Sequence, residues 1–268
     1  MIEKYNLNNK LVLIKAEIFL HQVHCVEAVL ESGGKPILIS SNMSKFVKVK
    51  EKMEKKYKTN IFVYLLNAID EQDIIELRNT IFSNFDTHPD VLINDSGIDF
   101  EQENESNTGN IKLDEMMIKH WDSIISEKLT SILLLTKIFG HKMAIAKGGV
   151  ILNILSDIYL NPKMNIFNPI LKVNHTSLVS VTNGIYGFTK YIATYWNEKN
   201  VRSNSLTIGN YKENSFLKKD KDILVNQIPI GRLANNDEFK AAIIFLISDA
   251  SSYMTGSNLV VNGGRTCW

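Results

Sequence analysis

Lys10-Leu-Val-Leu-Ile14 begins the strand–turn–helix unit that decides the fold of this chain. The apolar run predicts a buried strand, and the stretch from Cys25 to Gly33 predicts the end of the helix that follows it. Between them lies Lys15-Ala-Glu-Ile-Phe-Leu-His-Gln22, a turn that contains no glycine. The unit therefore predicts a sheet covered by helices, with a first turn of unusual composition.

Further along the chain, short apolar runs alternate with helical stretches, a pattern typical of a parallel sheet with crossover helices. The predicted strands are Leu11–Ile14, Pro36–Ile39, Ile61–Leu66, Val91–Asn94, Val150–Ile154, Arg202–Thr207 and Asn258–Val261. The predicted helices are Phe19–Ser32, Lys45–Lys58, Asp70–Phe85, Trp121–Ala146, Leu178–Asn197 and Asp237–Ser248. Asn235 is the predicted cap of the last helix. We expect one α/β domain over residues 1–268, a Rossmann-like doubly wound sheet of about seven parallel strands with helices on both faces.

Composition and charge exclude several classes of function. The chain has 268 residues and a net charge of +1, so neither nucleic acid nor a membrane is an expected partner. No apolar run approaches the roughly 18 residues of a membrane-spanning helix, and we expect no signal peptide. The two cysteines, Cys25 and Cys267, lie at opposite ends of the chain without zinc-ligand spacing. We expect a cytoplasmic protein with free thiols and no metal site.

Several short segments occur in a distinctive order and spacing. They are Asp90-Val-Leu-Ile-Asn-Asp-Ser-Gly97, Trp121-Asp122, Gly148–Ser156, Val201–Leu206, Gly231-Arg-Leu-Ala234, Ser248–Gly256 and Asn258–Gly264. Together they resemble the short-chain dehydrogenase/reductase family over nearly the whole chain. Tyr191–Trp196 and the ending Gly263–Trp268 resemble a bacterial subgroup often linked to surface-sugar or flagellin-glycan biosynthesis. The resemblance implies an oxidoreductase that uses NAD or NADP. Whether the chain keeps the family's cofactor-binding and catalytic residues can be checked position by position.

The first turn departs from the glycine pattern that this resemblance implies. The family uses glycines there for a tight turn, for close approach to the pyrophosphate and for helix packing. Counting back from Gly33 without a gap places these positions on Ala16, Leu20 and Gln22. Side chains at such positions occupy the space of the pyrophosphate. The groups that could still donate to an anion at the helix start are Lys15, His21 and His24.

Other positions of the implied cofactor site differ as well. The second strand ends in Ser40-Ser41 instead of the acid that often binds the ribose, and the third ends in Asn67 instead of aspartate. Where the family has a proline–glycine pair after the sixth strand, this chain has Ile208-Gly209, so the glycine alone is kept. Asn94 and Gly97 match the family's fourth-strand segment. We therefore interpret the cofactor site as degenerate.

The catalytic positions are also altered. The family uses a tyrosine acid/base, a lysine one turn later that lowers its pKa, and a serine that orients the substrate oxygen. Tyr186 and Lys190 have this spacing, but they lie too close to the following strand. A gap-free alignment instead places the tyrosine and lysine positions on Leu178 and Thr182, neither of which can do this chemistry. Ser156 alone keeps its family position.

The family's helical asparagine corresponds to Lys128. A buried lysine needs a carboxylate or a route to water. Glu127 is adjacent in sequence, so we expect it to point elsewhere on the helix. We hypothesise that Lys128 fills space that the family's catalytic lysine and water occupy.

Three functions fit these observations. The first is a catalytically degenerate member without cofactor, a structural or regulatory partner in a homo-oligomer (dimer or tetramer) or with an active relative, in bacterial sugar biosynthesis. The second is an atypical oxidoreductase that uses NAD or NADP with Tyr186, Lys190 and Ser156 on a sugar or nucleotide-sugar. The third is a cleft that binds a sugar or nucleotide without redox chemistry.

Overall fold

The structure is a computed structural model of the chain. It describes residues 2–15, 20–41, 43–95, 116–157, 160, 176–212 and 221–267. The side chains of Leu20, His21 and Gln22 lie outside what it describes, as do Ala16 and Gly97.

A single parallel sheet forms the centre of the described structure. Its strands are β1 (Leu11–Lys15), β2 (Lys35–Ser40), β3 (Phe62–Leu65), β4 (Val91–Asp95), β5 (Gly149–Ser156), β6 (Val201–Ile208) and β7 (Asn258–Val261). They pair in the order β3-β2-β1-β4-β5-β6-β7, and the neighbouring strands run parallel to one another. The predicted Rossmann-like fold is confirmed, and the predicted strands match within two residues at each end.

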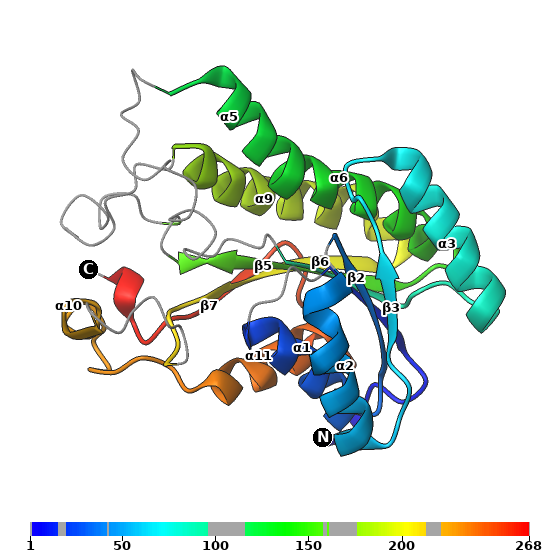
Figure 1. Cartoon of the computed structure of the whole chain (residues 1–268), viewed down its shortest axis with the longest axis horizontal. Helices are drawn as coiled ribbons and strands as arrows, with labels where there is room; N and C mark the ends of the chain where they lie inside the picture. Colours follow the sequence, from blue (N-terminus) through cyan, green and yellow to red (C-terminus); the bar gives the residue numbers. More distant parts are fainter. Residues whose placement is uncertain are drawn as a thin grey trace.

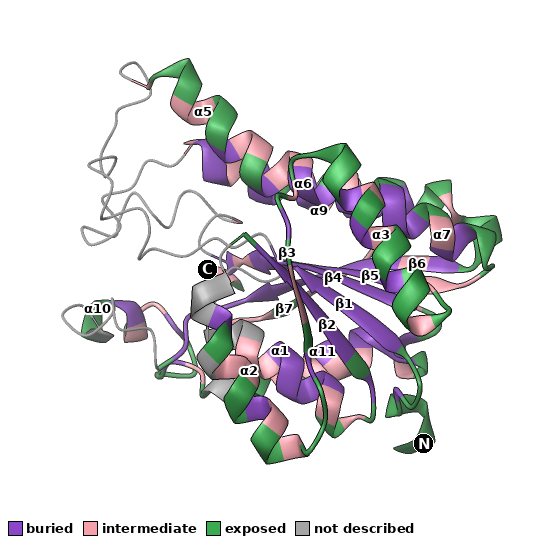
Figure 2. Ribbon diagram, turned by 45° about the vertical axis from the view of Figure 1, so that its right-hand side comes forward, coloured by how far each residue is buried: buried purple, intermediate pink, exposed green. Residues whose placement is uncertain are grey.

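Helices cover both faces of this sheet (Figure 1). One layer contains α1 (Leu20–Glu31), α2 (Met43–Tyr57) and α11 (Lys240–Ile247). The opposite layer contains α3 (Glu71–Phe85), α5 (Ile118–Ile124), α6 (Ser131–Leu135), α7 (His141–Ile145) and α9 (Thr176–Tyr195). Side chains alternate between these layers along each strand, so β1 sends Val12 and Ile14 to the α1 and α11 core but Leu11 and Leu13 to the other. Figure 2 shows the buried residues on the helix faces turned toward the sheet.

The long helix predicted at Trp121–Ala146 begins earlier and is not uniform. It starts at Ile118, and two π-helical segments, Ile125–Thr130 and Thr136–Gly140, separate α5, α6 and α7. Each π-helical segment shifts the helix face that meets the sheet, a feature that apolar spacing alone does not encode.

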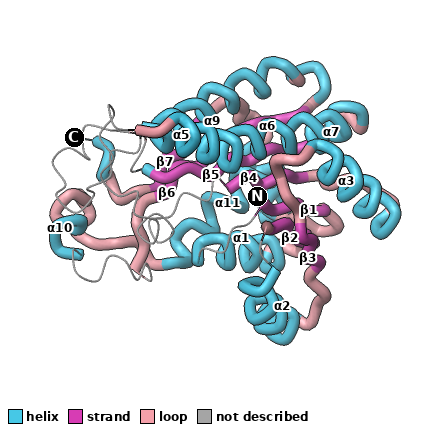
Figure 3. Tube along the Cα trace, turned by 45° about the horizontal axis from the view of Figure 1, so that its top comes forward, coloured by secondary structure: helices cyan, strands magenta, loops and turns pink. Residues whose placement is uncertain are grey.

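The ends of the remaining elements are close to the prediction. The 3₁₀ turn Asn236–Phe239 leads into α11, and the predicted cap is confirmed because Asn235 and Glu238 form a capping box. A short helix that the sequence did not predict, α10 (Lys221–Val225), lies beyond the ends of β6 and β7, near the C-terminus (Figure 3). The other short 3₁₀ turns are Ile2–Tyr5, Asn197–Lys199, Asp249–Ser251 and Arg265–Cys267.

Candidate functional site

The carboxyl edge of the sheet is the expected ligand site of such a fold. The strand order reverses between β1 and β4, and ligands of open α/β sheets bind in the crevice at this switch point. Lys15 ends β1 and is only 3% exposed. Its Nζ lies 3.5 Å from the backbone oxygen of Glu127, on the helix that covers β4. A buried lysine side chain therefore crosses the crevice at the point where the strand order reverses.

A hollow of about 180 Å³ lies beside Lys15, at the ends of β2 and β3. Ser40, Ser41 and Asn67 line it, together with Glu127 and Lys15 itself. The structure thus brings together Ser40 and Asn67, two of the residues that the sequence assigned to one cofactor site. The positions Ala16 and Gly97 lie outside the described residues, and so do the side chains of Leu20 and Gln22.

The positions aligned with the family's tyrosine and lysine lie on α9, facing the sheet. Leu178 and Thr182 are both 0% exposed. Leu178 packs in an apolar cluster with Leu155 of β5 and Ile132 of α6. The hydroxyl of Thr182 has no hydrogen-bond partner among the described residues. This part of the helix is therefore a packed core surface without an ionisable group.

Tyr186 and Lys190 lie elsewhere on the same helix. Tyr186 is about 12 Å along the helix axis from Leu178, at 1.5 Å per residue. The nearby Thr189 accepts a hydrogen bond from the amide of Asn153, which places this part of α9 beside the middle of β5 rather than its end. Lys190 is exposed, and its Nζ lies 4.4 Å from the centre of the Tyr186 ring. The structure pairs these two residues with each other and not with Ser156, the last residue of β5.

Lys128 is buried as expected, but the prediction for its neighbour is wrong. Its Nζ lies 3.7 Å from Oε1 of Glu127, so the adjacent carboxylate is its ion-pair partner. Two features allow the Lys128 ammonium to reach the carboxylate of its neighbour. Both side chains are long and flexible, and the segment is π-helical rather than α-helical. The hypothesis that Lys128 fills a vacated catalytic space stays a prediction.

The NH₂ group of Asn94 is used within the fold, whereas its Oδ1 has no hydrogen-bond partner among the described residues. Its Nδ2 donates to Thr136 at 3.1 Å and to Oδ1 of Asn153 at 2.9 Å, and Asn153 donates in turn to Thr189. These four side chains are buried, and their hydrogen bonds connect β4 and β5 to the helical segments that contain Thr136 and Thr189. Gly209, after β6, has a packing role, since a Cβ there would lie 2.8 Å from Cα of Asn262.

The structure contains a buried ion pair near Ser156, between Asp157 and Arg265, that the sequence did not predict. Asp157 accepts a hydrogen bond from Arg265 at 3.1 Å and another from Asn262 at 3.2 Å, and both charged side chains are 1% exposed. Arg265 also donates to Gln227. The network joins the end of β5 to the segment after β7. Residues more than 100 positions apart form it, and neither carries a local sequence signal.

Comparison with known proteins identifies the family. Residues 23–266 match the family model described as Enoyl-(Acyl carrier protein) reductase. The chain belongs to the short-chain dehydrogenase/reductase family.

Curated members of the short-chain dehydrogenase/reductase family are similar to this chain at moderate identity. The 3-oxoacyl-[acyl-carrier-protein] reductase FabG of Thermotoga maritima is 28% identical over 206 residues, 75% of each chain. The acetoacetyl-CoA reductase of Allochromatium vinosum is 32% identical over 178 residues, 65% of each chain. The FabG of Aquifex aeolicus is 26% identical over 245 residues, 88% of this chain and 89% of the relative.

Solved structures agree on the fold. A protein described as gox2181 superposes with a TM-score of 0.84 at 21% identity over the whole of both chains. A gluconate 5-dehydrogenase from Burkholderia cenocepacia in complex with NADP and tartrate gives a TM-score of 0.82 at 19% identity, covering 100% of this chain and 99% of the other. At these identities the likeness shows the fold alone.

The Lys15 side chain lies in the crevice at the switch point. Leu178 and Thr182, which the gap-free alignment predicts for the positions of the family's tyrosine and lysine, are buried. Among the described residues no cluster of three potential metal ligands occurs. None of the described helices combines the length and apolarity that crossing a bilayer requires.

Proposed function

We propose that this chain is a non-catalytic member of the short-chain dehydrogenase/reductase family, a pseudoenzyme. The observation that carries the proposal is the complete burial of Leu178 and Thr182 against the sheet. Hydride transfer to a carbonyl needs a proton donor at the substrate oxygen, and a lysine nearby lowers the pKa of that donor. Leucine has no proton to give, and threonine carries no charge.

The proposal includes the absence of a resident NAD or NADP. Lys15 lies in the crevice where the family's dinucleotide crosses the sheet, and its ammonium is held 3.5 Å from the Glu127 carbonyl oxygen. A cofactor in that position has to displace a buried lysine and accommodate the side chains that replace the glycines of the first turn. Both requirements oppose binding.

We assign the chain a structural or regulatory role in an oligomer. The two helical regions with which family members commonly associate are α5–α7 and α9, and both expose large apolar side chains: Leu133, Ile145, Tyr191 and Tyr195. The partner is a second copy of this chain, in a dimer or tetramer, or an active relative. The resemblance to a bacterial subgroup supports a pathway of sugar biosynthesis.

A hydride-transfer assay tests the proposal. Purified chain is mixed with NADPH and acetoacetyl-CoA, and the loss of NADPH absorbance is followed, with the Thermotoga maritima FabG as a positive control. We expect no turnover above the rate without protein. Turnover that disappears in Tyr186→Phe but not in Tyr195→Phe would contradict the proposal and establish Tyr186 as the acid/base.

A second function, an atypical oxidoreductase acting on a sugar or nucleotide-sugar hydroxyl or ketone, is supported by one observation. The hollow lined by Ser40 and Asn67 keeps room and polar groups at the adenine end of the family's site. The names of the relatives, reductases of acyl substrates, also favour redox chemistry. The same assay with NADH and with UDP-sugars distinguishes this function from the first.

A further inference from the structure

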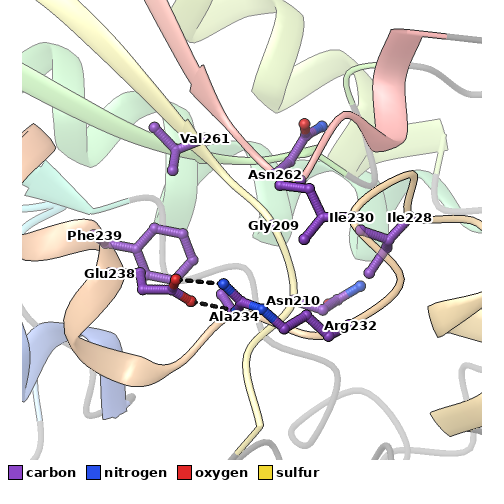
Figure 4. A pocket seen from close by; sticks show the side chains of 11 residues that line it. Gly209, Asn210, Ile228, Ile230, Arg232, Ala234, Glu238, Phe239, Val261 and Asn262 are labelled. Atoms are coloured by element: carbon purple, nitrogen blue, oxygen red, sulfur yellow. Dashed lines mark hydrogen bonds and ion pairs between the residues drawn. The ribbon is translucent and has the colours of Figure 1, made fainter.

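A second hollow lies on the other side of β6, away from Lys15 and Ser40. Its volume is about 260 Å³, and it lies between the ends of β6 and β7 and the segment that leads into α11. Its walls are largely apolar, with Ile228, Ile230, Phe239 and Val261 among them (Figure 4). It shares no lining residue with the hollow at Ser40.

The charged residues of this hollow neutralise each other. Arg232 donates from both guanidinium ends to the two oxygens of Glu238, each at 2.7 Å (Figure 4). Glu238 also accepts from the backbone N–H of Asn235, and these bonds lower the pKa of its carboxyl group to about 2. The pair is bidentate and stays ionised at neutral pH, so the hollow offers no net charge to a ligand.

Asn210 contributes a polar group with no assigned structural role. The residue is 7% exposed, and its amide nitrogen has no hydrogen-bond partner among the described residues. In Figure 4 the amide extends into the space between Arg232 and Ile228 instead of turning out of the hollow. A buried amide without a partner destabilises the folded state, and native proteins leave few such groups.

The other amide on the wall is already satisfied. Asn262 donates to Asp157 and to Thr266, and its oxygen accepts from the N–H of Gly264. Asn210 is therefore the group in this hollow that is poised to donate to a ligand.

We propose that this hollow binds a small, uncharged molecule with an apolar body and one carbonyl oxygen, which accepts a hydrogen bond from Asn210. A hollow of about 260 Å³ suits a compound of fragment size. The apolar walls favour a ring or short branched chain, and the neutralised Arg232–Glu238 pair disfavours an ion. The hollow shares no lining residue with the one at Ser40, and Gly209 is the one residue that it shares with the cofactor positions predicted from the sequence.

Cyclohexanone is a suitable probe, and ¹H–¹⁵N NMR of the full-length chain is the readout. We expect saturable shifts with a millimolar dissociation constant at the amides of Gly209 and Gly263 and at the side-chain NH₂ of Asn210. Methylenecyclohexane has nearly the same shape without the oxygen, and we expect it to bind at least fivefold more weakly. Equal binding of the two compounds, or shifts confined to other parts of the chain, would overturn the proposal.

Two variants separate binding from folding. Asn210→Leu should weaken cyclohexanone binding about fivefold to tenfold while raising the melting temperature, because it removes a buried unpaired amide at similar volume. Asn226→Ala, an exposed amide near the hollow but not part of its lining, should change neither quantity. A lower melting temperature for Asn210→Leu would mean that the amide has a structural partner, and it would refute the assignment.

Discussion

Thr182, at the position predicted for the family's lysine, is a polar residue buried on α9. Its hydroxyl is buried, and no described residue hydrogen-bonds to it. Thr182→Val replaces that hydroxyl by a methyl group of similar size, so we expect the free energy of unfolding to rise by about 1 kcal/mol. Urea denaturation of the two proteins measures this difference. A loss of stability of the same size would show that the hydroxyl makes a hydrogen bond in the folded protein.

Asp157 and Arg265 present the opposite case, because both partners of the ion pair are buried and satisfied. Arg265→Met leaves a buried carboxylate without its counter-charge, and we expect a loss of about 3–5 kcal/mol. The matched control is Lys137→Met, which breaks an exposed pair with Glu71 and should change stability by about 1 kcal/mol or less. Equal effects in the two variants would mean that the Asp157–Arg265 pair is open to solvent.

At the scale of elements, Gly140 of the second π-helical segment packs against Trp196, the residue that follows α9. A Cβ at Gly140 would lie 2.4 Å from the ring of Trp196. We expect Gly140→Ala to destabilise the chain by about 1–3 kcal/mol, because the ring and the helix must move apart. Gly187→Ala is the control: it is also in a helix, but no atom lies within 4 Å of the added Cβ, so it should stabilise by up to about 1 kcal/mol. Thermal denaturation followed by circular dichroism reports both.

Glu27 joins three helices on the other face of the sheet. Burial raises the pKa of its carboxyl group, but hydrogen bonds from Lys240 of α11 and Lys56 of α2, with a smaller contribution from His24, outweigh burial and lower it to about 2. The unfolded chain has the higher pKa, so the stabilisation is present above about pH 4.5 and is lost as the pH falls toward 2. Glu27→Gln should therefore lower stability at pH 7 and flatten its dependence on pH in that range. An unchanged acid profile, measured by urea titration, would exclude this tie between the helices.

Strands were predictable at this scale because burial on both faces leaves near-continuous apolar runs, as in Leu11–Lys15 and Val91–Asp95. The capping box at Asn235 was predictable because it is local. The π-helical segments, the Glu127–Lys128 contact and α10 were not, because each depends on tertiary packing or side-chain conformation. For the site, the sequence placed Ser40 and Asn67 at one strand edge, but it could not reveal the Asp157–Arg265 pair or the unpaired amide of Asn210.

At the scale of the whole molecule, the fold and the proposed loss of function are independent. The sheet order, the helix layers and the match over residues 23–266 define the family. The chemistry of that family depends on a few positions at one edge of the sheet, and these can change while the core remains packed. A chain of this kind can keep the surfaces through which family members associate.

Titration calorimetry with NADH and NADPH, at up to millimolar ligand, tests the central claim most directly. The account predicts no heat of binding for either nucleotide, with the Thermotoga maritima FabG as a control that should bind. Saturable binding that survives Asn210→Leu but is lost in Ser40→Leu would place the nucleotide in the switch-point crevice. That result would contradict the claim that this member of the family has lost its cofactor.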